Sequence, residues 1–384
     1  MIRCEPHSAR VDRGVALLQK PKSRKEGAMG RKALWAVMGL AVGVLAIGSP
    51  VMAAEPAKKK EQPKAEAKGE VFKWKAQTLW AAQETPHKTF EEFCAKVKRM
   101  TNGRLEIQAF PAGAVVPTNE TLDALKNNVL QAIHVWPGYA AGKNPAFAAL
   151  TDLIFAYEHP WELDAFMHYR GGLDMLRELY KPFGAYTVGV MFWGVESWPS
   201  KKPITKLEDF KGVKIREPQG MEAEFMAKAG ASVVVLPGTE VFSALDKGVI
   251  DATNWGTASI NEKMGFHQIA PYFTYPGFHS MPVGDFTVNQ KEWDRLPDDI
   301  KAIVTTATRE WCWDTVEKVA LEDLKVVGEA KAKSRTPVSW SAEEKSKARK
   351  VAREIWADWK KKNEQTRKVI EAQEAWLKEL GRID

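Results

Sequence analysis

Short β-rich runs alternate with helical stretches along residues 71–384, a pattern that leaves few architectures open to the chain. The β-rich runs lie at residues 72–78, 105–110, 185–193, 213–216 and 232–236, and helical stretches such as 85–101 and 118–129 lie between them. Strands that alternate with helices in this way indicate an α/β fold. A folded chain of about 315 residues is roughly twice the usual domain size, so two domains are predicted.

Residues 1–54 have the pattern of a leader for export. A basic segment at 30–32 precedes an uninterrupted apolar run at 33–47, and residues 51–53 offer small side chains at the usual spacing for cleavage. Fifteen apolar residues are too few to span a bilayer, which takes ~20. The pattern therefore predicts a Sec signal peptide at residues 29–53 rather than a membrane anchor.

A polar segment separates this leader from the predicted domains. Residues 55–70 have the composition of a disordered tether. Met29 stands immediately before the basic segment of the leader, so translation can begin at Met1 or at Met29. The sequence leaves this choice open.

The positive charge of the chain lies mostly before its folded part. The formal net charge is +7, but residues 1–54 hold nine Lys or Arg against three Asp or Glu, and residues 55–69 add a net +2. The rest of the chain carries 42 basic and 43 acidic side chains. No basic stripe remains that would bind a phosphate backbone, so a nucleic-acid partner is not expected.

The mature chain contains two cysteines, Cys94 and Cys312. Cys94 follows Phe93 on an amphipathic stretch, and Cys312 lies between Trp311 and Trp313. Both are interpreted as small buried apolar residues. An oxidising compartment would also permit a disulfide between them, which the sequence cannot decide.

One arginine stands at the end of a short predicted strand. Val213 and Ile215 alternate with Lys214, and Pro218 ends the run, so Arg216 lies where the strand gives way to a loop. Ligands of open α/β sheets bind at this end of the strands, and a guanidinium pairs with a carboxylate through two parallel hydrogen bonds. Taken alone, the same pattern also fits a solvated or ion-paired surface arginine.

The segments on both sides of Arg216 resemble, in order, those of the extracytoplasmic solute receptors of tripartite ATP-independent periplasmic (TRAP) transporters. The strand that carries the family's carboxylate-binding arginine resembles KGVKIREPQG, and the helix and turn that line its pocket resemble VLPGTEVFSALDKGVIDATNW. The first strand, helix, strand and helix of the family resemble FKWKAQTLW, TFEEFCAKVKRMTNGRLEIQAFPAGAVVP and DALKNNVLQAIHVWPGY. The branch that binds 2-oxo and 2-hydroxy monocarboxylic acids is similar to GFHQIAPYFTYPGF.

This resemblance implies a two-domain periplasmic binding protein of the α/β class, with a hinge, a domain-spanning helix and a long C-terminal helix. The implied domain I comprises residues 71–192 and 283–322, and domain II comprises residues 193–282 and 323–384, with crossings near Trp193 and Met281.

Two helices of this architecture can be located in the sequence. The spanning helix is expected to begin near Asp298. A capping-box pattern at Ser341 predicts the start of the C-terminal helix, whose charged run continues to Leu380. Three tryptophans recur on that helix, Trp356, Trp359 and Trp376. Tryptophans at such positions usually pack against the rest of the fold. By resemblance to the keto-acid branch, a homodimer formed through this helix is an open alternative.

By resemblance, Arg216 anchors the ligand carboxylate and Asn254 and Trp255 contact the ligand. In the keto-acid branch, the position of Asn254 is usually an acidic residue that helps to coordinate a metal ion bridging the ligand. Asn254 supplies no charge for a hard cation, and the other metal-side position falls near Met191, which is also a poor ligand for such an ion. No cofactor or metal is therefore expected, although a bridging ion stays open.

Aromatic side chains are expected to form the walls of the pocket. The candidates at strand ends or loop starts are Trp80, Trp136, Tyr139, Phe155, Trp193, Trp255 and Phe278. For each of these residues taken alone, packing in the core explains the pattern as well as ligand contact does. Trp193 and Trp255 are the favoured ligand contacts, because the matching family positions contact ligand. His279 is a weaker candidate, and Glu196 is an alternative partner for Arg216 in the empty receptor.

The resemblance implies a periplasmic receptor that binds a small organic monocarboxylate and delivers it to the small and large membrane subunits of a TRAP permease. Which acid is bound stays open. A receptor that presents its ligand to a membrane sensor fits the same pocket. A periplasmic enzyme gets little support, since the chain has no HExxH, GxSxG, glycine-rich phosphate loop or paired CxxC.

Overall fold

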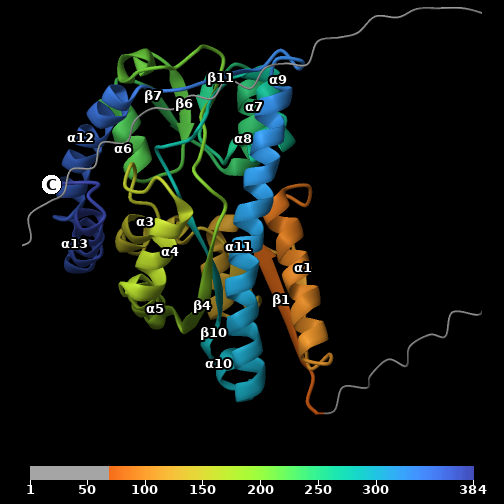
Figure 1. Cartoon of the computed structure of the whole chain (residues 1–384). Helices are drawn as coiled ribbons and strands as arrows, with labels where there is room; N and C mark the ends of the chain where they lie inside the picture. Colours follow the sequence, from red (N-terminus) through yellow and green to blue (C-terminus); the bar gives the residue numbers. More distant parts are fainter. Residues whose placement is uncertain (1–68) are drawn as a thin grey trace, which may run out of the picture. The chain divides into compact units, whose positions relative to one another are not determined.

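The computed structural model describes residues 69–384 and shows two β-sheets with helices packed around them (Figure 1). The predicted leader at residues 1–54, its signal peptide and nearly all of the tether lie outside the described residues. No helix among the described residues is both long and apolar enough to cross a membrane.

The first sheet has five strands in the order β2-β1-β3-β10-β4. These strands are β1 (Phe72–Thr78), β2 (Leu105–Phe110), β3 (Ala132–His134), β4 (Ala185–Phe192) and β10 (Val283–Asn289). β1 pairs in parallel with β2 and β3, whereas β10 pairs antiparallel with β3 and β4. The parallel strands β1 and β3 therefore end at the same edge of the sheet.

The second sheet has six strands in the order β11-β9-β5-β8-β6-β7. These strands are β5 (Pro199–Ser200), β6 (Lys214–Glu217), β7 (Ser232–Val235), β8 (Ala252–Thr253), β9 (Tyr272–Thr274) and β11 (Thr336–Val338). β6 lies between β7 and β8 and is parallel to both. All six strands are short, so this sheet depends strongly on the packing of its helices.

The helices agree with the predicted alternation. Those before the second sheet are α1 (Thr85–Met100), α2 (Thr121–Lys126), α3 (Ala146–Thr151), α4 (Pro160–Tyr169) and α5 (Gly172–Tyr180). The helices that follow, up to the return to the first sheet and just beyond it, are α6 (Met221–Lys228), α7 (Val241–Asp246), α8 (Ala258–Lys263), α9 (Phe266–Ile269) and α10 (Gln290–Asp294). The helix expected to reach residue 129 ends earlier, because Asn128 adopts a φ of 58°.

The chain passes between the two sheets three times, the third time from β10 to β11. It leaves the first sheet after Phe192 and returns to it at Val283. The first two crossing segments lie side by side, since the backbone N–H of Glu196 donates to the carbonyl of Ser280 at 2.8 Å. The division into two domains at these crossings stays a prediction.

The long helix α11 (Asp298–Glu329) begins where it was expected. It packs against α1 and β4 of the first sheet's side and against α8 of the second sheet's side, so it runs along both (Figure 1). The two cysteines are separate thiols: Cys94 on α1 and Cys312 on α11 are both buried and unpaired. The interpretation of both as buried apolar residues is confirmed.

The single long C-terminal helix expected from the charged run is wrong. The structure has two helices, α12 (Ala342–Trp359) and α13 (Glu364–Glu379). Asn363 separates them, because its extended backbone leaves the helix and its side chain accepts a hydrogen bond from the N–H of Thr366 at 2.7 Å. The break lets α12 pack on α6 and α13 pack on α3, which one straight helix could not do.

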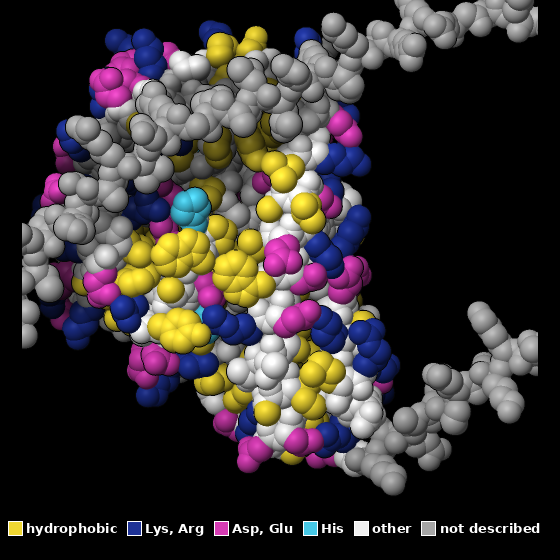
Figure 2. Space-filling model, viewed as in Figure 1, with side chains coloured by type: hydrophobic (Ala, Val, Ile, Leu, Met, Phe, Trp, Pro, Cys, Tyr) yellow, Lys and Arg dark blue, Asp and Glu magenta, His cyan; other side chains and the backbone are white. Residues whose placement is uncertain are grey.

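The surface of the described residues agrees with their balanced charge. Figure 2 shows Asp and Glu side chains interspersed with Lys and Arg on the visible face, particularly along α11. Many of them form ion pairs with a near neighbour, such as Lys318 with Asp314 and Arg309 with Asp164. This face has no basic stripe of the kind that binds nucleic acid.

Candidate functional site

A small cavity lies where the carboxyl ends of strands from both sheets meet. Its free space is about 30 Å³, close to the volume of one water molecule. Seven of the residues predicted to contact a ligand line it, namely Trp80, Trp136, Tyr139, Trp193, Arg216, Asn254 and Trp255. The remaining lining residues are Leu79, Asp152, Glu196, Pro218, Glu222 and Pro282.

The wall on the side of the first sheet is aromatic. Trp80 follows β1, Trp136 follows β3, and Trp193 follows β4, so the ends of three strands at one edge of the first sheet place the rings in the cavity wall. The rings of Trp80 and Trp193 meet edge to face with centroids 4.8 Å apart. Gly138 makes room for the ring of Trp136, since a Cβ there would lie 2.1 Å from it.

Two indole N–H groups in this wall have no partner. The Nε1 atoms of Trp80 and Trp136 are buried and make no hydrogen bond within residues 69–384. A buried donor without an acceptor costs about 1–3 kcal/mol. Both groups are therefore suited to donate to an oxygen atom of a ligand.

Arg216 forms the opposite wall, at the end of β6. Its Nε donates to the carbonyl of Leu236 at 2.9 Å and its Nη1 to the carbonyl of Asn254 at 2.6 Å. These carbonyls follow β7 and β8, the two strands beside β6, so the sheet itself orients the guanidinium. No carboxylate of the described residues lies within ion-pair distance of Arg216, although the side chain is only 3% exposed.

Trp255 connects this wall to the side of the first sheet. Its Nε1 donates to Glu84 Oε1, just before α1, at 2.9 Å, and its ring packs on Trp80 with centroids 5.8 Å apart. The ring lies so close to Gly238 that a Cβ there would be 1.9 Å from it. Burial raises the pKa of Glu84 to about 7, although the hydrogen bond from Trp255 opposes the shift.

Three buried carboxyl groups form the floor of the cavity, and we call them the acid cluster: Asp152, Glu196 and Glu222. Burial raises the pKa of all three, and their mutual repulsion raises that of Asp152 and Glu196 further. Ser280 donates to Asp152 Oδ2 at 2.8 Å, and Trp193 Nε1 donates to Glu196 Oε1 at 2.9 Å. In this cluster Asp152 follows α3, Glu196 lies on a crossing segment, and Glu222 belongs to α6.

Asn254 and His279 complete this network. Asn254 Nδ2 donates to Glu222 Oε1 at 2.8 Å, and Asn254 Oδ1 lies 3.2 Å from His279 Nε2. His279 stacks on Trp198 with centroids 3.7 Å apart, and burial lowers its pKa well below the ordinary value. The ring is therefore neutral, and its Nε2 donates to the amide oxygen.

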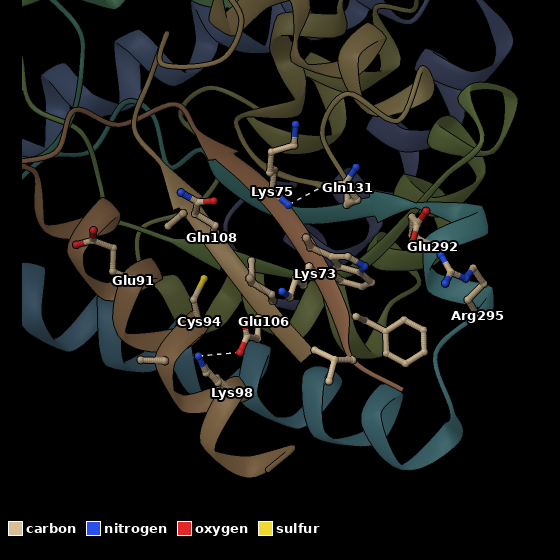
Figure 3. Close-up of a pocket in the computed structure, with 16 residues that line it drawn as sticks. Lys73, Lys75, Glu91, Cys94, Lys98, Glu106, Gln108, Gln131, Glu292 and Arg295 are labelled. Carbon is tan, nitrogen blue, oxygen red and sulfur yellow. Dashed lines mark hydrogen bonds and ion pairs between the residues drawn. The ribbon is translucent and has the colours of Figure 1, made fainter. Parts of the chain in front are cut away.

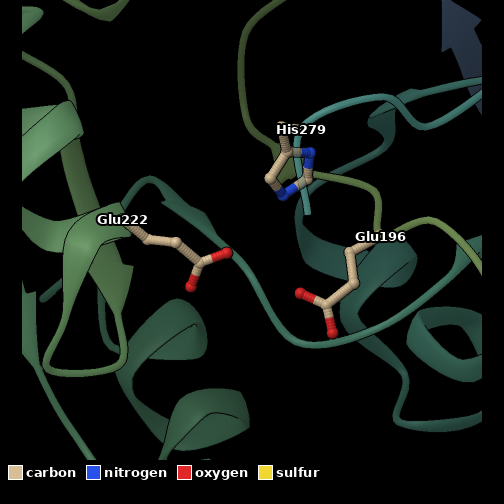
Figure 4. A group of neighbouring side chains, drawn as sticks. All are labelled: Glu196, Glu222 and His279. Carbon is tan, nitrogen blue, oxygen red and sulfur yellow. The ribbon is translucent and has the colours of Figure 1, made fainter. Parts of the chain in front are cut away.

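Glu196, Glu222 and His279 are the group in the described residues with the best geometry for a metal ion. One ligand atom of each lies within 4.8 Å of the others, and Figure 4 shows the carboxyl groups facing each other beneath a ring nitrogen of His279. Several of their atoms already have hydrogen-bond partners, because Asn254 connects Glu222 to His279 Nε2 and Trp193 holds Glu196, whereas His279 Nδ1 has no partner within residues 69–384. A cation bound through Glu222 Oε1 or His279 Nε2 would have to displace the amide of Asn254.

Besides His279, which lies behind Asn254, three residues weighed in the sequence do not line the cavity. Phe278 packs between Trp198 and Trp340, with ring centroids 5.7 and 5.0 Å away. Phe155 packs on Phe225 at 4.6 Å. Met191 is fully buried in β4 and is absent from the lining.

The sequence interpretation missed most of the acid cluster. Glu196 was considered only as a partner of Arg216, which is wrong, because its oxygens bind Trp193 and Ser280 instead. Asp152 and Glu222 were not singled out. Glu222 could have been found, since it follows Arg216 by one loop, but nothing in the local sequence of Asp152 points to the cavity.

A larger hollow lies elsewhere, against the edge of the first sheet. It has a volume of about 830 Å³ and is lined by charged and apolar side chains, most of them from β1, β2 and α1 (Figure 3). Lys98 pairs with Glu106 at 2.9 Å, and Gln131 accepts from the backbone of Lys75 at 2.9 Å. The cationic side chains that line this open surface are exposed, so it has no buried cation comparable to Arg216.

Comparison with known proteins gives consistent matches over most of the chain. The family model described as bacterial extracellular solute-binding protein, family 7 (DctP) matches residues 76–363. A monocarboxylate 2-oxoacid-binding periplasmic protein of Nostoc sp. is 30% identical over 311 residues, which cover 80% of this chain and 85% of that protein.

Solved structures match as well. A TRAP periplasmic solute-binding protein from Rhodobacter sphaeroides in an apo open form is 35% identical, with a TM-score of 0.68 over 81% of this chain and 99% of that one. Another from Pseudoalteromonas atlantica, with bound sodium and pyruvate, is 28% identical, with a TM-score of 0.71 over 81% of this chain and 95% of that one. The two-sheet α/β architecture and the predicted family are thus confirmed.

Proposed function

Since the chain belongs to the DctP family of TRAP solute-binding proteins, we propose that it is a periplasmic receptor that holds a small organic carboxylate through Arg216 and delivers it to a TRAP permease. Members of this family are solute-binding proteins rather than enzymes. The monocarboxylate and pyruvate ligands of two relatives support the choice of ligand class.

One observation carries the proposal: Arg216 is a buried cation that has no carboxylate partner among the described residues. Two backbone carbonyls fix its guanidinium, and the N–H groups that they leave free make no hydrogen bond within residues 69–384. A ligand carboxylate would pair with these N–H groups through charge-assisted hydrogen bonds. The unpaired indole donors of Trp80 and Trp136 would share its oxygens.

Ligand binding would stabilise the contact between the two walls. Arg216 belongs to the second sheet, and Trp80 follows a strand of the first, so a ligand that touches both favours the arrangement in which they are close. The crossing segments at Glu196 and Ser280 are the natural hinge for such closure. We propose that the permease subunits, one small and one large, recognise the closed form.

A homodimer through the C-terminal helix stays a prediction. The faces of α13 that carry Val369, Ile370 and Leu377 are buried within the same chain, where α13 packs on α3. Any dimer contact would therefore use the outer face of α13.

Mass spectrometry of protein purified without refolding tests the proposal directly. A co-purified small carboxylate is the expected result, followed by calorimetric binding of the same compound to stripped protein. Pyruvate and lactate serve as reference ligands if no ligand is retained. The proposal fails if no compound co-purifies and no carboxylate of two to six carbons binds.

A further inference from the structure

We propose that the ligand carries an ammonium group as well as a carboxylate, with Arg216 holding the carboxylate and the acid cluster holding the ammonium. This inference rests on the proposed function, because it assigns the second end of the ligand in the same cavity. It departs from the uncharged keto or hydroxyl group that the sequence resemblance implies. The substrate class is therefore a small amino acid or a related zwitterion.

The charges that line the cavity are unbalanced. Arg216 is the only basic side chain in the lining, whereas Asp152, Glu196 and Glu222 all contribute carboxyl groups. A ligand with only negative charge would meet this floor without any attractive partner there. A ligand with one charge of each sign would find a complementary group at each end.

Asp152 provides an acceptor that no N–H or hydroxyl donor of the described residues uses, although the carboxyl group of Glu222 lies within hydrogen-bond reach of it. Its side chain is 6% exposed and lines the cavity, and its Oδ1 makes no hydrogen bond with a donor, whereas Oδ2 accepts from Ser280. A buried acceptor without a donor is unfavourable, so the structure has a place for a donor from outside the protein. An ammonium group has three N–H donors and no acceptor.

Burial explains why the acid cluster can exist when no ligand is bound. It raises the pKa of Asp152, Glu196 and Glu222, which favours their neutral, protonated forms in an empty cavity. A nearby ammonium favours the ionised carboxylate instead. The cluster therefore gains its strongest interaction only when a cationic group is present.

The aromatic wall suits the same group. Faces of tryptophan rings attract cations, and the guanidinium of Arg216 already lies over the ring of Trp255, 5.7 Å from its centroid. Trp80 and Trp193 also line the cavity beside the acid cluster. An ammonium between these rings and the carboxyl groups would lose its water shell at a small cost in free energy. Its charge would be stabilised by the ring faces on one side and by the carboxyl groups on the other.

A metal ion is the other possible source of positive charge, and the geometry disfavours it. The amide of Asn254 stands between Glu222 and His279 and hydrogen-bonds to both. An ammonium needs only hydrogen-bond acceptors, which Oδ1 of Asp152 and the carboxyl oxygens of Glu196 and Glu222 can provide. It leaves the amide of Asn254 in place.

Matched ligand pairs test the inference by calorimetry on the full mature chain after removal of any retained ligand. Each pair has one carbon skeleton and differs only at C2: lactate against alanine, and 2-hydroxyisocaproate against leucine. We expect the amino member of the better-binding pair to bind at least about tenfold more tightly, as a charge-assisted contact requires. All buffers contain a chelator, and a parallel series contains calcium or zinc chloride.

Variants identify the residues responsible. Asp152→Asn, or Glu222→Gln if that variant does not fold, should reduce the preference for the amino member at least fivefold while the affinity for the hydroxy member changes little. Asp285→Asn is the matched control, because Asp285 is a fully buried acid that does not line the cavity and accepts hydrogen bonds from Thr287 and the backbone of Val135 instead. It should retain the preference of the parent protein.

The outcomes separate this inference from the proposed function. Equal or tighter binding of the hydroxy or keto acids overturns the ammonium site and leaves the carboxylate receptor intact. Binding of lactate that appears only with added calcium or zinc overturns it in favour of a metal. Failure of both members of every pair, and of pyruvate, contradicts the receptor function itself.

Discussion

The two ends of the cavity contain opposite charges and are built in opposite ways. Arg216 stands on one strand, and the neighbouring strands β7 and β8 orient it through backbone carbonyls. The acid cluster takes Asp152, Glu196 and Glu222 from three distant parts of the chain and holds them through side-chain hydrogen bonds. The basic end is thus a local feature of one sheet, and the acidic end exists only when both sheets and the crossing segments are assembled.

Their response to burial also differs. An arginine keeps its charge in any protein environment, so Arg216 remains a cation when it is 3% exposed. Burial instead raises the pKa of the acids, and their charge depends on what enters the cavity. Arg216 is therefore charged with or without a ligand, whereas the charge of the acid cluster depends on the ligand that is bound.

Arg216→Lys should have the largest effect and would break the anchor. Lysine keeps the charge but loses the planar fork and its two backbone contacts, so ligand affinity should fall by about 10- to 100-fold or more, as for loss of a hydrogen bond to a charged group. Calorimetry measures the change. Arg295→Lys on the exposed surface is the matched control. Near-normal binding in Arg216→Lys would refute bidentate recognition.

Trp255→Phe should weaken the link between the two walls. Phenylalanine retains a ring beside Trp80 but loses the hydrogen bond to Glu84, which contributes about 0.5–1.5 kcal/mol, or roughly 2- to 12-fold in affinity. The rate of ligand release should rise, as stopped-flow tryptophan fluorescence would show. Trp161→Phe is a control, because Trp161 is half exposed and does not line the cavity. An unchanged release rate would mean that this contact does not hold the walls together.

The ligand-free protein should be more stable at pH 5 than at pH 8. Burial raises the pKa of Glu84 to about 7 and that of Asp285 to about 6, so the folded state binds more protons than the unfolded state between pH ~4.5 and ~7. Stability is then lost as pH rises through this window. Thermal unfolding should show a fall in Tm of about 2–4 °C for each kcal/mol lost.

Glu84→Gln sharpens that test. The amide can still accept the hydrogen bond from Trp255 but does not titrate, so the fall in Tm between pH 5 and pH 8 should be smaller in this variant. A pH dependence identical to that of the parent protein would assign the effect to other buried acids.

Removal of metal ions should have the smallest effect. Asn254 contributes no charge and hydrogen-bonds to both Glu222 and His279, so dialysis against a chelator should leave ligand affinity within about twofold. Calorimetry before and after dialysis provides the comparison. A lost or strongly weakened isotherm would show that a cation takes part in ligand binding at the acidic end of the cavity.

Much of the fold could be predicted because its signals are local. The strand at Phe72–Thr78 follows from the pattern of a few adjacent residues. The start of α11 at Asp298 was expected from the resemblance to the family's spanning helix. The break at Asn363 was missed because a charged helical pattern continues on both sides of it. Only the packing of α13 on α3 makes the interruption favourable.

The same distinction between local sequence signals and tertiary packing applies to the candidate site. Arg216, Asn254 and Trp255 lie within one continuous motif, and the cavity contains all three. Phe278 fits the aromatic pattern equally well but packs against Trp340. A sequence pattern shows that an aromatic residue will be buried, but it does not show against what.

By itself, the sequence determined the α/β class, the family and the arginine at the strand end, because each depends on residues that are close along the chain. The tertiary structure alone decided that Asp152, Glu196 and Glu222 share one cavity floor. Their pKa values, and with them the charge that a ligand meets, come from burial and from neighbours that are distant in sequence. Such effects arise only when the chain is folded and water is excluded.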